Sequence, residues 1–318
     1  MLQSKLTLGL FLVAALIASA GYIRAQNAPS GGAVPAHLVV TVVAHSGNQV
    51  PAVQAGDVQV YQNRERLQVT DWTPLQGAQA ALQLFIAVDD AAQPAAFGSN
   101  IADLRNFITS QPATTAVGVA YMRNGTVSIT QQLTNDHAAA AKGVRLPLGN
   151  DGAFGSVYLS IADLIQRWPQ SNVRREIVMI SDGIDELGSF GVSNPYVDSA
   201  VQKAQQNGIV VFAIYTPGFG RYYRSYWRMN MGQIHLSQIS DETGGEAYFL
   251  GFQAPVSYTP YLDDINQRLN HQYLLTFAVP APNKPKLVPV RLRTEVPNAE
   301  LIAADQAWVG ASASGTRD

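Results

Sequence analysis

The stretch LQLFIAVDD, residues 82–90, decides the fold. Such a short, almost uninterrupted apolar run predicts a strand buried on both faces, as the central strand of a parallel sheet is. A second run of this kind, IVMIS at 177–181, is followed by DGID. In open α/β sheets the ligand crevice lies just beyond the carboxyl ends of such strands. We therefore expect Asp89 and Asp182 to lie at one functional edge of the sheet.

Strand-like and helical patterns alternate through residues 80–252. A further apolar run, IVVFAIY, fills 209–215, helical spacing is present at 101–108, and Asn124-Gly125 is a strong hairpin signal. This alternation is typical of an α/β, Rossmann-like domain with a doubly wound, mostly parallel sheet.

Both ends of the chain carry a different β pattern, at 35–75 and at 258–310, the second after a connecting helix. LVPVRLRT at 287–294 is expected to form one strand. Neither end has enough residues to bury a core alone. We predict that the two ends pair in a second, small antiparallel β module.

Composition excludes several classes of function. The 318 residues include no Cys, so disulfides, thiol nucleophiles and thiolate metal sites are excluded. The formal net charge of −2 leaves no basic excess to neutralise phosphates, so nucleic acid is not expected as a partner.

The N-terminus has the pattern of a signal peptide, residues 1–20. Lys5 precedes the apolar run 6–18, and Ala18-Ser19-Ala20 fits a cleavage site. The alternative, a membrane anchor, requires about 20 apolar residues. We expect an exported protein, periplasmic or secreted, with no membrane span after cleavage. Residues 21–34 are expected to form a linker, and the small, polar residues 311–318 a disordered tail.

Residues 82–250 resemble the von Willebrand factor type A (VWA) domain, in a branch found in exported bacterial proteins. The resemblance is carried by IAVDD, the RNG hairpin, IVMISDG, IVVFAIY and the ETGG turn. The flanking stretches VPAHLVV and HQYLLTFAVP are similar to the same branch. The order and spacing of these motifs, rather than any one of them, identify the family.

The resemblance implies a metal-ion-dependent adhesion site. In the family the first strand ends in Asp-x-Ser-x-Ser, and a Thr from a second loop and an Asp after the fourth strand complete the Mg²⁺ shell. Asp89 and Asp182 match the Asp positions, and Ser156 is the candidate hydroxyl of the second loop, whereas Ala91 and Gln93 replace the two serines. Because Mg²⁺ requires several hard oxygen ligands, we predict a degenerate site that binds it weakly or not at all, and no cofactor.

A second candidate site is the loop GFGRYYRSYWRMNM, residues 218–231. Tyr, Trp, Arg and Met are enriched in protein interfaces, and the loop leaves the same sheet edge as Asp89 and Asp182. The candidate partner-binding residues are Arg221, Tyr222, Tyr223, Arg224, Tyr226, Trp227 and Arg228. The alternative is that these aromatic side chains fold over the sheet edge into a local core.

These features predict an exported, non-enzymatic adhesion or scaffold protein that binds a protein partner. One alternative is a cation-dependent VWA adhesion protein with a divergent Mg²⁺ site. Another is a metal-assisted hydrolase that uses Asp89 and Asp182. A third is a purely structural component of the cell envelope.

Overall fold

The computed structural model describes residues 32–149, 155–188, 191–219 and 225–311. The predicted signal peptide, nearly all of the predicted linker, residues 312–318 of the predicted tail, and candidate residues 221–224 lie outside these ranges. Among the described residues, none of the helices is long and apolar enough to cross a membrane.

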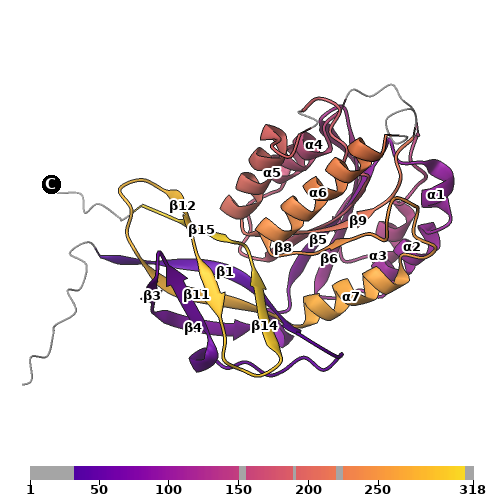
Figure 1. The fold of residues 1–318 in the computed structure, drawn as a ribbon. Coiled ribbons are helices and arrows are strands. Elements are labelled where there is room, and N and C mark those ends of the chain that lie inside the picture. Colours follow the sequence, from indigo (N-terminus) through magenta and orange to yellow (C-terminus); the bar gives the residue numbers. More distant parts are fainter. Residues whose placement is uncertain (1–31, 150–154, 189–190, 220–224, 312–318) are drawn as a thin grey trace, which may run out of the picture.

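A doubly wound sheet forms the centre of the larger part of the molecule (Figure 1). Its order in the described chain is β10-β9-β8-β5-β6-β7, and only β7 runs antiparallel, beside β6. The strands are β5 (Leu82–Asp89), β6 (Thr115–Arg123), β7 (Thr126–Thr134), β8 (Arg174–Ser181), β9 (Ile209–Tyr215) and β10 (Ala247–Tyr248). The predicted α/β fold class is confirmed.

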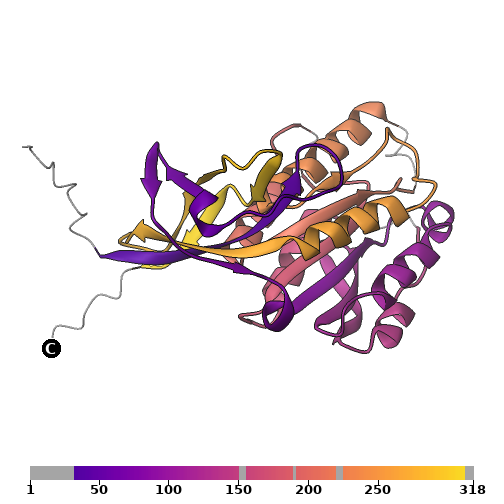
Figure 2. The same ribbon diagram turned by 90° about the horizontal axis from the view of Figure 1, so that it is seen from below.

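Helices cover both faces of this sheet, as Figure 2 shows. On one face lie α1 (Pro94–Gly98), α2 (Ile101–Thr109), α3 (His137–Lys142) and α7 (Thr259–Asn270), and on the other α4 (Val157–Arg167), α5 (Pro195–Gln206) and α6 (Tyr226–Thr243). Strand β5 supplies Leu84 and Ile86 to the first core and Phe85 and Ala87 to the second. Its unbroken apolar run follows from this burial on both faces.

Local sequence signals set several element ends. Ser156 caps α4 by accepting a hydrogen bond from the Leu159 N–H. The β6–β7 hairpin turns at Asn124 and Gly125, both with positive φ, as this turn type requires.

The second part is a β module made from both chain ends, as predicted. Strand β11 lies between β1 and β4, in the described order β14-β1-β11-β4, while smaller sheets pair β13-β2-β3 and β12-β15. The N-terminal strands are β1 (Ala33–Ala44), β2 (Gln59–Gln62), β3 (Glu65–Leu67) and β4 (Val69–Pro74), with short 3₁₀ turns at Ala55–Asp57 and Gly77–Gln79. The C-terminal strands are β11 (Gln272–Pro280), β12 (Lys286–Pro289), β13 (Arg291–Arg293), β14 (Ala299–Ala303) and β15 (Gln306–Val309).

Two local predictions for the module were wrong. The single strand expected at 287–294 is divided into β12 and β13, which pair in different sheets, because the N–H of Val290 turns to the carbonyl of Asp305. Strand β1 begins at Ala33, within the stretch expected as linker, because Ala33 pairs with Pro280 of β11.

The β module sits at the amino ends of the parallel strands. Arg174, the first residue of β8, donates hydrogen bonds to Gln272 of β11 and to the carbonyl of Leu269. The carboxyl ends of β5, β8 and β9 therefore point away from the module, toward the opposite end of the molecule (Figure 1).

Candidate functional site

The structure brings Asp89, Asp182 and Ser156 together in one pocket at the carboxyl edge of the sheet. The pocket has a volume of about 30 Å³, room for a small ion or a few water molecules. Asp89 ends β5, Asp182 follows β8, and Ser156 precedes α4. Parallel strands that end at one level explain why residues far apart in sequence meet here.

Both oxygens of the Asp89 carboxyl group already have partners within the protein. The Ser181 hydroxyl donates to Oδ2 at 2.7 Å, and the Ala91 N–H donates to Oδ1 at 2.9 Å. Ser181 is fully buried and also accepts a hydrogen bond from the Gly183 N–H. The sequence carries a signal for Ser181, a polar residue that ends an apolar strand, but Ser181 was not among the predicted site residues.

Asp182 is held by its own loop and by a glycine. Its Oδ1 accepts a hydrogen bond from the Ile184 N–H at 2.8 Å. Its Oδ2 lies 2.0 Å from the position that a Cβ on Gly218 would occupy. Residue 218 therefore has to be glycine for the Asp182 carboxyl group to keep this orientation.

Burial raises the pKa of both carboxyl groups. Loss of hydration raises the pKa of Asp89 to about 6, although the hydrogen bond from Ser181 opposes the shift. Loss of hydration, followed by repulsion from Asp89, raises the pKa of Asp182 well above its usual value. At neutral pH the pair thus tends to retain a proton, which offsets the repulsion between two buried carboxylates.

The ligands that remain do not fit a family-type Mg²⁺ shell. Ala91 lines the pocket and offers no side-chain oxygen, and Gln93 is not among its lining residues. The Ser156 hydroxyl is engaged at the start of α4. Across the described part of the chain, no three His, Asp or Glu side chains converge in a group able to hold a metal ion.

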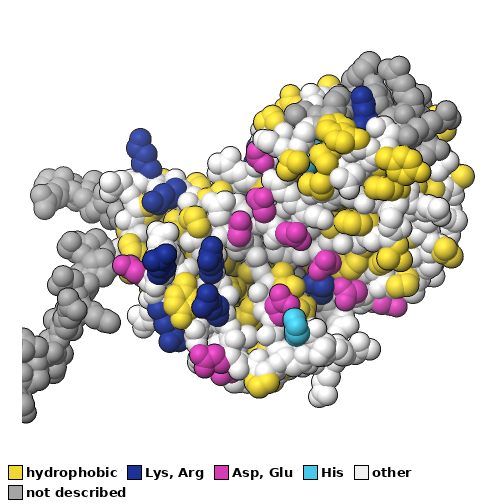
Figure 3. Space-filling view, viewed as in Figure 1, with side chains coloured by type: hydrophobic (Ala, Val, Ile, Leu, Met, Phe, Trp, Pro, Cys, Tyr) yellow, Lys and Arg dark blue, Asp and Glu magenta, His cyan; other side chains and the backbone are white. Residues whose placement is uncertain are grey.

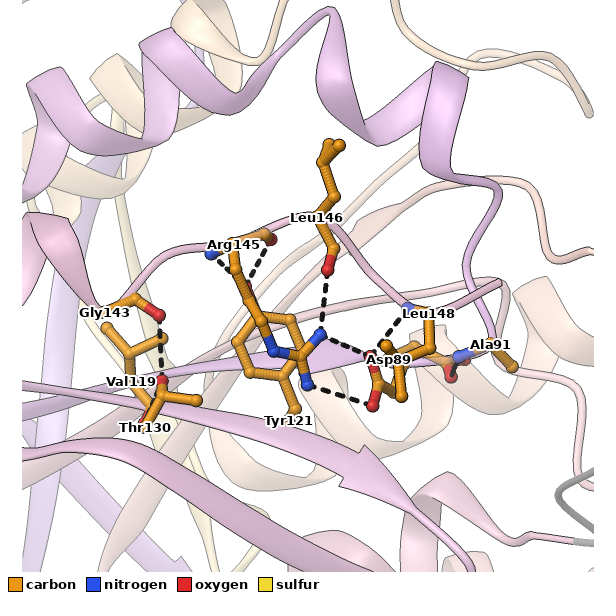
Figure 4. Close-up of polar contacts among 10 residues, drawn as sticks. Asp89, Ala91, Val119, Tyr121, Thr130, Gly143, Arg145, Leu146 and Leu148 are labelled. Carbon is orange, nitrogen blue, oxygen red and sulfur yellow. Dashed lines mark hydrogen bonds and ion pairs between the residues drawn. The ribbon is translucent and has the colours of Figure 1, made fainter. Parts of the chain in front are cut away.

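A third carboxylate at this edge, Asp90, forms an ion pair that was not predicted from the sequence, and Figure 4 shows its partner, Arg145, lying over the Tyr121 ring. The Arg145 guanidinium binds both Asp90 oxygens, at 2.7 and 3.0 Å, and lies 3.7 Å from the centroid of the Tyr121 ring. The Leu148 N–H adds a hydrogen bond to Asp90 Oδ1 at 2.9 Å. Arg145 thereby fixes the loop after α3 against the end of β5, and local sequence carries no signal for this pairing.

The part of the aromatic loop that the structure describes is exposed at the same edge. The relative exposure is 76 % for Tyr226 and 53 % for Trp227, and both open α6. Arg228 is only partly exposed, and its N–H lies 3.5 Å from the Ser225 hydroxyl that caps the helix. Phe219, just before the undescribed residues 220–224, is also exposed.

Exposed apolar side chains gather at the same edge of the sheet as this pocket, and one of them, Phe219, lines it. Ten large hydrophobic side chains are exposed among the described residues, and nine of them lie on loops or helix starts at the carboxyl edge. We call these nine the apolar rim: Leu146, Leu148, Leu187, Val192, Phe219, Tyr226, Trp227, Leu250 and Val256. Figure 3 shows hydrophobic side chains spread over this end of the molecule. The tenth, Trp308, is on β15 of the β module.

The site and the sheet follow the pattern that the sequence resemblance implied. One Asp ends the first strand of the doubly wound sheet, β5, and another follows its fourth strand, β8. The chain has a VWA-like fold. Its VWA-like domain departs from the family pattern at Ala91 and Gln93.

Comparisons with known proteins give structural likeness only. No family model and no curated protein matches the sequence. An aerotolerance-related membrane protein from Bacteroides fragilis aligns at 16% identity and a TM-score of 0.45, over 60% of this chain and 99% of that one. The VWA domain of SpRpn10 aligns at 13% identity and 0.39, over 59% and 95%. The ArnB paralog VWA2 from Sulfolobus acidocaldarius aligns at 9% identity and 0.39, over 87% and 76%.

Proposed function

We propose that this chain is an exported, non-enzymatic adhesion or scaffold protein that binds a protein partner through the apolar rim of its VWA-like domain. The observation that carries the proposal is the gathering of nine of the ten exposed large hydrophobic side chains of the described chain at one edge. Exposed apolar surface of this kind typically marks interaction sites, because a soluble protein otherwise buries it.

The chemistry of the pocket supports binding rather than catalysis. Asp89 accepts hydrogen bonds from internal donors on both carboxyl oxygens, from Ser181 and Ala91, and Asp182 accepts one on a single oxygen, from Ile184. No nucleophile hydrogen-bonded to a base lines the pocket among the described residues. The partner is then bound without Mg²⁺, mainly by side chains that become buried in the interface, and aromatic side chains contribute most of that binding free energy.

Cation-dependent adhesion is the second candidate function, because Asp89, Asp182 and Ser156 share one pocket, as the family's metal ligands do. A metal-assisted hydrolase would use the same residues. Both alternatives require a divalent ion at this pocket. A chelator should therefore abolish the activity or binding in either alternative, but leave partner binding by the proposed function unchanged.

The test is capture of partners from the exporting cell by the parent chain and by two variants. Tyr226→Ala with Trp227→Ala removes two exposed aromatic anchors of the apolar rim, whereas Trp308→Ala removes an exposed aromatic far from it. Each lost anchor typically costs about 2 kcal/mol or more, so we expect affinity for the captured protein to fall about a thousandfold. The Trp308→Ala control should bind like the parent.

Two results would contradict the proposal. Equal capture by the double variant would exclude the apolar rim as the binding surface. Capture that disappears with a chelator and returns with Mg²⁺ would establish the cation-dependent alternative instead. The melting temperature of the double variant should stay close to that of the parent, because Tyr226 and Trp227 are exposed.

A further inference from the structure

The outer face of the small sheet β13-β2-β3 carries arginines around a tyrosine. In this sheet Tyr61 lies between Arg291 of β13 and Arg66 of β3. Arg293 is two residues from Arg291 and shares its face, with its guanidinium 5.6 Å from the Tyr61 ring centroid. All three arginines are exposed. We call Arg66, Arg291, Arg293 and Tyr61 the arginine face.

The opposite side of the same strands is apolar and accounts for the alternation. Val60 is fully buried in the core of the β module, and Leu67 and Leu292 pack against that core. The arginines are therefore the solvent-facing half of an alternating pattern. The sheet requires only a polar side chain at these exposed positions, so its formation does not explain why they are arginine.

The arginine face has an acidic neighbour in Glu295, which accepts a hydrogen bond from Gln59, itself an acceptor for the Tyr61 hydroxyl. Among the described residues, none of the three arginines forms an ion pair. Arg291 and Arg293, with Arg64 and Tyr61, also line an open hollow of about 920 Å³. Asp305 borders this hollow, and one of its carboxylate oxygens accepts a hydrogen bond from Gln205 at 2.6 Å.

On the face of the molecule that Figure 3 shows, basic and acidic side chains occupy different regions. Lys and Arg side chains gather over the β module, whereas Asp and Glu predominate over the adjoining part of the VWA-like domain. Because the whole chain carries a net charge of −2, the positive surface is a local feature and not a basic excess. An anionic partner is therefore attracted to the arginine face rather than to the acidic surface beside it.

The chain enters the module close to this positive surface. The carbonyl of Gly32 accepts a hydrogen bond from the Ala281 N–H, and the exposed Lys284 and Lys286 follow in the same loop and the start of β12. Lys284 and Lys286 therefore add to the positive charge of the β module near the point where the chain enters it.

We propose that the arginine face docks on an anionic phospholipid surface and holds the VWA-like domain away from it. Guanidinium groups bind lipid phosphates through paired hydrogen bonds, and tyrosine is enriched at the membrane–water interface. The apolar rim lies at the opposite end of the molecule, so docking leaves it accessible (Figure 1).

Co-sedimentation with vesicles tests this proposal. Residues 21–318 are mixed with vesicles of pure phosphatidylcholine or of equal parts phosphatidylcholine and phosphatidylglycerol. This form keeps every described residue and lacks the apolar run 6–18, which would itself insert into lipid. We expect binding only to the anionic vesicles, with loss at high salt because surface charges are screened.

Two matched double variants locate the surface. Arg66→Gln with Arg291→Gln removes two charges from the arginine face, and Lys142→Gln with Lys203→Gln removes two from helices of the VWA-like domain. Each basic residue near an anionic surface contributes about fivefold in partitioning, so the first variant should bind roughly twenty-five-fold more weakly and the second like the parent.

The proposal is overturned if the parent fails to bind anionic vesicles, binds neutral ones equally, or loses binding as much in the lysine variant. Melting followed by circular dichroism checks that the variants fold. Because Arg66 and Arg291 are exposed, their substitution should leave the melting temperature unchanged. If the double variant does unfold, the single Arg291→Gln variant, with an expected fivefold loss, carries the same test.

Discussion

At the scale of single residues, the carboxyl pair of the pocket is a source of instability that the fold tolerates. Asp89 is 5 % exposed, and burial raises its pKa to about 6 from 3.8. Between about pH 4 and pH 6 the folded chain binds more protons than the unfolded chain, so stability falls as pH rises through this window. Above about pH 6 the buried Asp89 carboxylate is ionised, and its full cost is subtracted from the free energy of unfolding.

Asp89→Asn should therefore stabilise the protein at pH 8 by about 2 to 3 kcal/mol, since an amide carries no charge to bury. The gain should shrink toward zero as pH falls to about 4. Urea unfolding across this pH range measures it, with Asp263→Asn at an exposed position as the matched control. A variant that is less stable than the parent at pH 8 would show that the ionised carboxylate is needed.

At the scale of elements, β11 joins the two ends of the module. It pairs with β1 over nine residue pairs, from Ala33 with Pro280 to Thr41 with Gln272, and with β4 on its other edge. Leu275 and Phe277 of β11 are fully buried in the module core. Without β11, strands β1 and β4 both lose the strand that lies between them and pairs with each.

Truncation after Asn270 removes β11 and the later strands but keeps α7, which covers one face of the central sheet. We expect residues 35–75 to become sensitive to protease, because their hydrogen-bonding partner and their core are both lost. The central sheet should survive as a protected fragment, since β5 to β10 and α7 all precede the cut. Limited proteolysis followed by mass spectrometry gives the answer, and protection of 35–75 in the truncated chain would refute the expectation.

At the scale of the whole molecule, a buried polar cluster fastens the VWA-like domain to the β module. Arg174 Nε lies 3.7 Å from Glu176 Oε1, and both side chains are almost inaccessible to solvent. Arg174 also bonds to Gln272, which in turn donates to the Thr41 hydroxyl of β1 at 3.3 Å. Desolvation raises the pKa of Glu176 to about 7, although the charge of Arg174 opposes the shift.

Arg174→Met should destabilise the protein by about 3 to 5 kcal/mol at pH 8, because it leaves the Glu176 carboxylate buried without a counter-charge. Adding Glu176→Gln removes that charge and should recover part of the loss. Chemical unfolding of the two variants measures the difference. Additive losses in the double variant would mean that the two side chains act independently.

The sequence alone determined the fold class and the location of the candidate site. Apolar runs such as 82–88 specify buried strands locally, and the Asp residues that end them are placed by strand direction, so Asp89 and Asp182 were predictable. The hairpin at Asn124-Gly125 was also fixed locally, by residues that tolerate positive φ.

Tertiary structure decided which groups meet. Arg145 pairs with Asp90 across 55 residues, and Ser181 fills an oxygen of Asp89. The division of 287–294 into β12 and β13 likewise depends on partners elsewhere in the chain. Periodicity reports whether a side chain is buried, but hydrogen-bond partners depend on how loops return to the sheet edge. The path of these loops is set by packing of the whole molecule and cannot be predicted from a local stretch of sequence.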